Sequence, residues 1–143
     1  MKINSNKIGG LICISLLFLA STSCSLTKGK ETSERAVVKF HSQLNASQFH
    51  EIYAQADESF RKATSEPDAI AYFEAVHRKL GEVKDSRMAG WRVNATPLGT
   101  MVNIGYQVEF AEGKGTEDFV FHVTGDQALL VNYTVNSSLL ITK

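Results

Sequence analysis

The sequence is poor in cysteine and proline, with 2 of each among 143 residues, and its 15 basic side chains balance its 15 acidic ones. Two cysteines cannot build the disulfide framework that stabilises a small secreted scaffold. A balanced chain without a run of basic residues lacks the positive surface that nucleic acids require, so no nucleic-acid partner is expected. The composition favours a globular domain stabilised by an apolar core.

The chain also lacks a long hydrophobic run. Its longest apolar segment, Ile8–Ala20, is shorter than the roughly 20 residues that a membrane-spanning helix needs. Lys2 and Lys7 precede this segment, and small residues follow it directly before Cys24. A basic start, an apolar middle and a small-residue end are typical of a secretory signal peptide. We therefore predict that residues 1–23 form a signal peptide.

Cys24 is the candidate lipid anchor. The sequence ASTSC resembles the bacterial lipoprotein signal, in which small residues precede a cysteine that is acylated and becomes the mature N-terminus. Cleavage would remove Cys13 and leave Cys24 without a disulfide partner, and lipid attachment explains an unpaired cysteine. We expect a lipoprotein of the bacterial cell envelope, held at the membrane by this lipid with its domain in the periplasm or outside the cell. Plain secretion after cleavage at the same bond is the alternative.

The mature chain divides into a short polar segment and one domain. Residues 24–33 lack large apolar side chains apart from Leu26, so we expect a flexible tether there. Residues 34–143 have the length of a single domain.

Helical spacing dominates the first half of this domain. Apolar side chains recur at three- and four-residue intervals over 37–44, 49–60 and 70–80. The last segment also has end signals, with Ser65 as its N-cap and Gly81 as its C-terminal stop. The spacing predicts three helices.

After the third predicted helix the apolar period becomes two. Alternation predicts four strands around residues 91–94, 101–110, 118–123 and 128–135, separated by the turn sequences TPLG (96–99), EGKG (112–115) and GDQ (125–127). Matching the apolar faces pairs Phe119 with Tyr133, and pairs Phe121 with both Val131 and Tyr106. The order of elements predicts an α+β domain, with N-terminal helices packed on one face of a curved four-stranded antiparallel meander.

The run YFEAVHRKLGEVKDSRMAGW, with the alternating strands that end in LLVNYTVNSSLL, resembles a group of small secreted bacterial proteins of unassigned function. The resemblance covers about residues 34–141 and depends on Leu80 with Gly81, on Trp91 and on the paired hairpins. It implies a nuclear-transport-factor-2-like, or cystatin-like, fold and a location in the envelope. It transfers no catalytic residue to this chain.

Motifs for catalysis are missing. The sequence contains no nucleophile elbow, phosphate-binding loop or dinucleotide fingerprint, so neither catalytic residues nor a cofactor are expected. His41, His50, His77 and His122 lack the spacing of metal ligands, and no metal site is expected. Glu117 is the only acid with the parity of the inward-facing strand residues, and a catalytic pair of Glu117 with Tyr133 is the minor alternative.

Two surfaces are candidates for binding. The side chains expected to line the cone between sheet and helices are those of Tyr53, Trp91, Tyr106, Phe121 and Tyr133. Those expected on the outer sheet face are Met101, Val120 and Leu130, where few charges lie and where the resemblance implies a homodimer.

These observations favour a non-enzymatic envelope lipoprotein that binds an unidentified ligand or partner. The alternatives are a small-molecule enzyme that uses the cone, and an inhibitor or immunity-type protein that blocks another enzyme. If the chain is a binding protein, we expect its cone to be filled by Phe and Tyr side chains with no acid inside. If it is an enzyme, we expect an open pocket that contains a carboxylate. If it is an inhibitor, we expect a protruding polar loop at EGKG.

Overall fold

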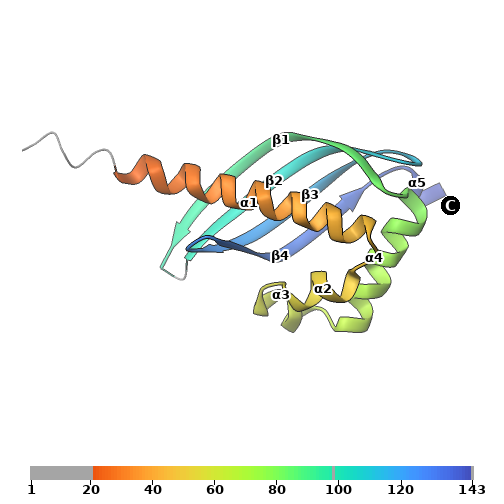
Figure 1. Cartoon of the computed structure of the whole chain (residues 1–143), viewed down its shortest axis with the longest axis horizontal. Coiled ribbons are helices and arrows are strands. Elements are labelled where there is room, and N and C mark those ends of the chain that lie inside the picture. Colours follow the sequence, from red (N-terminus) through yellow and green to blue (C-terminus); the bar gives the residue numbers. More distant parts are fainter. Residues whose placement is uncertain (1–20, 98, 143) are drawn as a thin grey trace, which may run out of the picture.

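The computed structural model of the chain describes residues 21–97 and 99–142, so most of the predicted signal peptide lies outside the described residues. In chain order the elements are α1 (Ser21–Asn45), α2 (Phe49–Ala54), α3 (Glu58–Ala63), α4 (Glu66–Leu80), β1 (Val83–Thr96), β2 (Gly99–Phe110), β3 (Gly113–Thr124), β4 (Gln127–Asn136) and α5 (Leu139–Thr142). The predicted α+β class is confirmed (Figure 1).

The sheet is an open antiparallel meander with the strand order β1-β2-β3-β4. Figure 1 shows that it curves, that α1 crosses it along its length and that α2, α3 and α4 lie beyond β4. The core fills the space between the two layers. Leu44 on α1, Phe73 on α4 and Val102 on β2 have no exposed surface at all. The helices therefore cover the apolar face of the sheet, as the strand alternation predicts.

The first helix is longer than the sequence predicts. α1 begins at Ser21 and includes the whole of segment 24–33, for which a flexible tether is expected. Thr32 and Ser33 are 3% and 0% exposed, and Gly29 is also buried. Small side chains let a helix approach a sheet closely, and this polar stretch therefore packs as part of the domain. In the structure, segment 24–33 is part of α1, and its residues Gly29, Thr32 and Ser33 are buried in the domain.

The second predicted helix is divided in two. α2 ends at Ala54 and α3 begins at Glu58, because the side chain of Asp57 accepts a hydrogen bond from the Ser59 N–H at 2.9 Å and starts a new helix. The backbone N–H of Asp57 also donates to the carbonyl of Leu130 at 2.8 Å. The break between α2 and α3 is thus the point where this segment bonds to the edge of β4.

The third predicted helix is confirmed together with its end signals. The Ser65 side chain caps α4 by accepting from the Asp68 N–H, and Pro67 lies in the first turn. Gly81 ends the helix with φ of 75°, and a Cβ there would lie 2.8 Å from the Cβ of Ala111. Both the backbone conformation and the close approach require glycine at this position.

The pairing of β3 with β4 is partly as predicted. Phe119 pairs with Tyr133, which is confirmed, but Phe121 pairs with Leu130 because a β-bulge at Val131 shifts the register. The bulge turns Leu130 toward the core, where it is 6% exposed. Its predicted place on the outer sheet face is therefore wrong.

The β2–β3 hairpin turns at Ala111 and Glu112, earlier in the chain than EGKG predicts. Tyr106 consequently pairs with Glu117 and not with Phe121. The shift is an even number of residues, so each side chain keeps its predicted face and the inner face stays apolar. The predicted core row through Tyr106 and Phe121 does not form, and an acid takes its place beside the tyrosine.

Substitutions at Gly29 distinguish a docked helix from a tether. A Cβ at this position would meet methyl groups of Thr100 and Val102 at 3.7 Å, an ordinary contact distance. We expect Gly29→Ala to raise the free energy of unfolding by about 0.5–1 kcal/mol, because alanine loses less backbone entropy in a helix. Gly29→Leu lowers it, since the larger side chain separates α1 from β2. Urea unfolding measures both, and a flexible segment would respond to neither.

Candidate functional site

A hydrogen-bonded group of three side chains lies between α1 and the sheet. Glu117 on β3 accepts a hydrogen bond from the Tyr133 hydroxyl on β4, with 2.6 Å between Oε1 and the phenol oxygen. Its other oxygen, Oε2, lies 2.6 Å from Nε2 of His41 on α1. We call His41, Glu117 and Tyr133 the buried triad. Because its members come from three different elements, only the folded chain assembles it.

The buried triad is almost completely removed from solvent. Glu117 is 0% exposed, Tyr133 5% and His41 8%. A carboxylate in an apolar interior is strongly destabilising unless partners compensate for its lost hydration. His41 and Tyr133 supply that compensation, one at each carboxylate oxygen. Burial, then the negative charge of Glu117 and the hydrogen bond to it, raise the pKa of Tyr133 well above its usual value.

Aromatic rings surround the buried triad and close it off. The ring centre of Phe119 lies 5.9 Å from that of His41 and 5.1 Å from that of Tyr133, and Phe40 lies 4.6 Å from Tyr133. Neither of the two hollows described below is lined by a member of the triad. The interior thus contains the acid expected of an enzyme without an open pocket beside it. The buried acid differs from the interior expected of the binding protein, and the linings of the two hollows differ from the open acid-containing pocket expected of the enzyme.

The residues predicted to line the cone lie in different surroundings. Tyr106, Phe121 and Tyr133 are buried in the core, and Tyr53 is half-buried at its margin. Trp91 is 47% exposed and lies on the edge strand β1. Lys30 Nζ lies 6.0 Å from the centre of the Trp91 ring. Trp91 is consequently a surface residue and not part of the cone interior.

The outer sheet face differs from the prediction at one position. Met101 and Val120 occupy this face, where each is half-buried. Because of the bulge, Leu129 pairs with His122 and takes the place that the sequence assigns to Leu130. A homodimer through this face stays a prediction.

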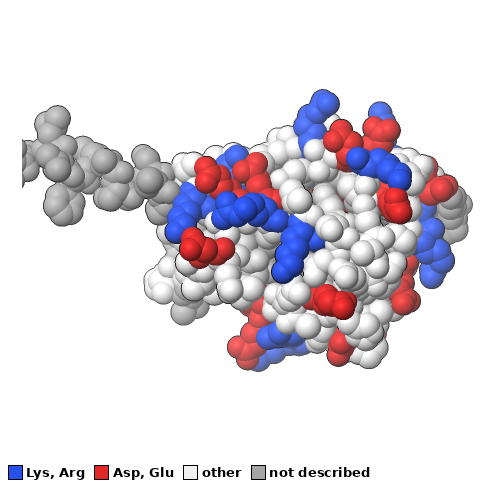
Figure 2. Space-filling view, viewed as in Figure 1, with Lys and Arg blue, Asp and Glu red and all other residues white. Residues whose placement is uncertain are grey.

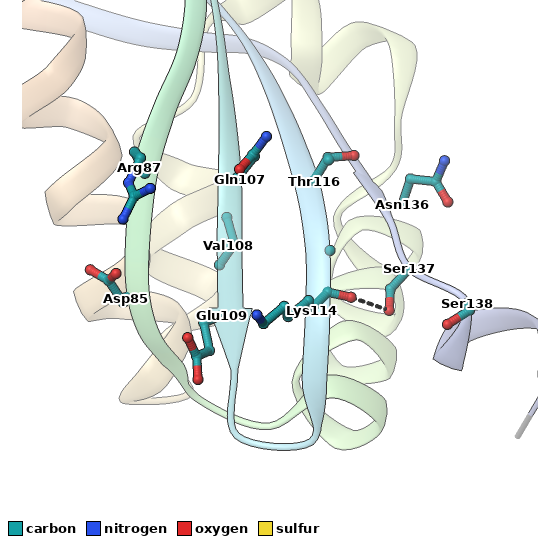
Figure 3. A pocket seen from close by; sticks show the side chains of 11 residues that line it. Asp85, Arg87, Gln107, Val108, Glu109, Lys114, Thr116, Asn136, Ser137 and Ser138 are labelled. Carbon is teal, nitrogen blue, oxygen red and sulfur yellow. Dashed lines mark hydrogen bonds between the residues drawn. The ribbon is translucent and has the colours of Figure 1, made fainter.

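A polar hollow of about 550 Å³ lies at one end of the outer face. Figure 3 shows its side chains arranged across the strands, with a hydrogen bond from the Ser137 hydroxyl to the Lys114 carbonyl. The lining includes one row of paired residues, Arg87, Gln107 and Thr116 with Asn136, and a second group made of Asp85, Glu109 and Lys114. Both signs of charge are present and aromatic side chains are missing from this lining, so the hollow selects no class of ligand.

A second hollow of about 520 Å³ is a groove between α1, the α2–α3 segment and β4. We call it the β4 groove. Its floor is apolar and comprises Phe40, Ile52, Phe121 and Leu130. Three basic side chains also line it, and they are Arg35 and Lys39 of α1 and Arg61 of α3. The β4 groove therefore combines an apolar base with a cationic border.

Basic side chains outnumber acidic ones around the β4 groove. Asp126 is the one acid in its lining, and it binds Lys28 Nζ at 2.8 Å. The hydrogen bond and charge of Lys28 hold the pKa of Asp126 below its usual range. Arg61 donates from Nη1 to the Ala54 carbonyl at 2.7 Å, which keeps its guanidinium at the groove. Figure 2 shows Lys and Arg side chains interspersed with Asp and Glu side chains along α1, beside a mostly uncharged surface.

Two of the three remaining histidines pair with carboxylates, whereas the buried Nε2 of His77 has no hydrogen-bond partner among the described residues. His50 lies 3.0 Å from Glu66, and His122 lies 3.0 Å from Asp57. The ring of His122 covers Gly99. Within residues 21–97 and 99–142, no group of three His, Cys, Asp or Glu side chains is placed to hold a metal ion.

These features define a class of protein: an α+β domain with helices on one face of an open antiparallel meander, a buried triad and a basic-bordered groove. Comparison of the sequence with protein-family models and with curated proteins finds no match.

The sequence indicates two members of the buried triad and misses the third. Parity along the strands predicts that Glu117 and Tyr133 face inward, and the structure joins them by a hydrogen bond. His41 lies in the apolar stripe of its helix, which predicts a residue at the edge of the core. A histidine within an apolar stripe, opposite a single inward acid, is the signal that would identify the pair.

Removal of the Glu117 side chain tests the energetic role of the triad. We expect Glu117→Ala to lower the free energy of unfolding by about 3–5 kcal/mol, because it leaves His41 and Tyr133 without their acceptor and opens a cavity. Glu117→Gln keeps the shape and one acceptor oxygen, so we expect a smaller loss of about 1–2 kcal/mol. Glu109→Ala, at an exposed acid of the outer face, is the control and stays within about 0.5 kcal/mol. Equal effects at positions 117 and 109 in urea unfolding would contradict this role.

Buried tyrosines make the protein sensitive to alkaline pH. Burial raises the pKa of Tyr106 to about 12, and burial together with the charge of Glu117 raises the pKa of Tyr133 well above its usual value. The unfolded chain releases phenol protons near pH 10 whereas the folded chain retains them, so stability is complete below about pH 10 and falls above it. We expect Tyr133→Phe to reduce the slope of unfolding free energy against pH in this range. Parallel slopes for the variant and the parent protein would refute the assignment.

Proposed function

We propose that this chain is a non-enzymatic binding domain of the bacterial cell envelope, attached to a membrane through lipid on Cys24. The observation that supports it best is the closed interior, in which the single inward acid is bonded to His41 and Tyr133. A reaction in the cone requires space for a substrate beside its acid, and rings occupy that space. The hollows described above lie outside the core, which favours recognition at the surface.

The position of Cys24 supports membrane attachment close to the folded domain. Cys24 lies in the first turns of α1, and Gly29 is the first buried residue among those of this helix whose burial is described. At a rise of about 1.5 Å per residue, this separation corresponds to roughly 8 Å along the helix. Acyl chains on Cys24 would therefore hold the domain near the lipid headgroups. None of the helices in the described residues is long and apolar enough to cross a membrane.

Substitution of Cys24 tests the anchor. Two or more acyl chains hold a protein stably at a membrane. We expect the purified native protein to begin at a modified Cys24 with the added mass of acyl chains, and Cys24→Ala to move from the membrane fraction to the soluble fraction. Cys13→Ala is the matched control and remains in the membrane fraction, because this residue belongs to the predicted signal peptide. A mature N-terminus at another residue would remove the anchor from the proposal.

A screen for ligands tests the binding function separately from the anchor. Ligands that bind only the folded state raise its melting temperature. We expect a compound or peptide that binds the β4 groove to stabilise the Cys24→Ser protein and to lose that effect in Lys39→Glu. Turnover of any bound compound would contradict a non-enzymatic function.

A further inference from the structure

One side of β4 is the free edge of the sheet. The strand order ends at β4, and an edge strand presents N–H and C=O groups that no neighbouring strand satisfies. The molecule satisfies two of these groups, because the Leu130 carbonyl accepts from the Asp57 N–H at 2.8 Å and the Val135 N–H donates to the Tyr72 hydroxyl at 3.4 Å. The bond from Asp57 is of the kind that a fifth strand would make with β4. No further backbone pairing with β4 follows Asp57 in this segment, because α3 begins at Glu58.

The Asp57 bond establishes which backbone groups face outward. In an antiparallel strand, alternate residues turn both their N–H and their C=O to the same side. The register is regular from Leu130 back to Gln127, so Ala128 presents its backbone groups on the same edge as Leu130. Ala128 also lines the β4 groove. Within the described residues, its backbone makes no hydrogen bond outside the sheet.

The groove beside this edge is lined by basic side chains that would attract an acidic peptide. An added strand would turn alternate side chains toward α1, where Arg35 and Lys39 lie four residues apart on one helix face. Arg61 lies on the opposite side of the groove, and the one acidic residue of the lining is already bound to Lys28. Lys39 makes no ion pair within the described part of the chain. The unbalanced charge is therefore positive.

We propose that the β4 groove binds an extended acidic peptide segment, which pairs with the β4 edge at Ala128 and places acidic side chains against Arg35 and Lys39. Main-chain hydrogen bonds supply affinity in this mode of recognition, and alternate side chains supply specificity. The free part of this edge runs from Gln127 to Leu129, because the Leu130 carbonyl is already bonded to Asp57, and it pairs with a segment of about three or four residues. The inference rests on the proposed binding function and names its class of partner.

The test uses a labelled peptide of about six residues in which Glu alternates with Thr or Val, and the Cys24→Ser protein, which keeps every described side chain. We expect saturable binding by fluorescence anisotropy that weakens as salt is added. Lys39→Glu and Arg35→Glu each weaken it by at least about tenfold, since each converts an attraction into a repulsion. Arg78→Glu, at an exposed cation of α4 away from the groove, changes it by less than about twofold.

Two further measurements report the backbone pairing. Hydrogen exchange of the Ala128 amide slows when the peptide is bound, because the added strand takes up this N–H. A peptide of the same sequence with N-methyl groups at alternate amides binds at least about tenfold more weakly, as it cannot complete the pairing. These measurements need no change to the protein, so they do not depend on the folding of a variant.

Four results would overturn the peptide proposal. They are no measurable binding of the Glu peptide, equal binding of a peptide with Lys in place of Glu, equal binding of the methylated peptide, and unchanged exchange at Ala128. Sodium decanoate, an anionic amphiphile, shows whether the error lies in the proposed peptide partner or in the proposed binding function. If decanoate binds in the β4 groove and the peptide does not, the binding domain stands and its ligand is an anionic amphiphile. If neither binds, the assignment of the groove as the binding site also fails.

Discussion

The carboxylate of Glu117 is the constraint on which the arrangement of the layers depends. It lies in a mostly apolar and aromatic core, so its two oxygens need partners that only correct packing supplies. His41 brings α1 to the middle of the sheet, and Tyr133 requires the observed register of β4 against β3. A helix rotated on its axis or a strand displaced by two residues would leave the charge unpaired. Apolar packing alone is less selective, because neighbouring apolar arrangements differ little in energy.

Because the interior is closed, a ligand or partner can be recognised only at the surface. The rings around the buried triad leave no opening at Glu117, whereas the division between α2 and α3 leaves a groove along β4. The same residue, Asp57, creates that division and bonds to the strand edge. An unprotected edge strand promotes unspecific pairing, and covering part of it with a helical segment limits the exposed length. Protection of the edge and formation of the groove are therefore two effects of one local structure.

Sequence patterns predicted the elements better than the contacts between them. The order of helices and strands, the capped α4 and the pairing of Phe119 with Tyr133 follow from local periodicity and turn chemistry. The docking of segment 24–33 was not predictable from its polarity, because small polar side chains pack well only where another surface is complementary. The inward turn of Leu130 depends on a bulge, and a bulge changes the face of a residue without changing the alternation that precedes it.

Local sequence patterns are sufficient to predict the class of fold and the inward direction of Glu117. These properties depend on period, parity and composition, which are readable one segment at a time. Only the tertiary structure decided that His41 is the partner of Glu117, that Trp91 lies at the surface and that Arg35, Lys39 and Arg61 border one groove. Each of these depends on how distant segments approach in space, and no local pattern encodes that distance.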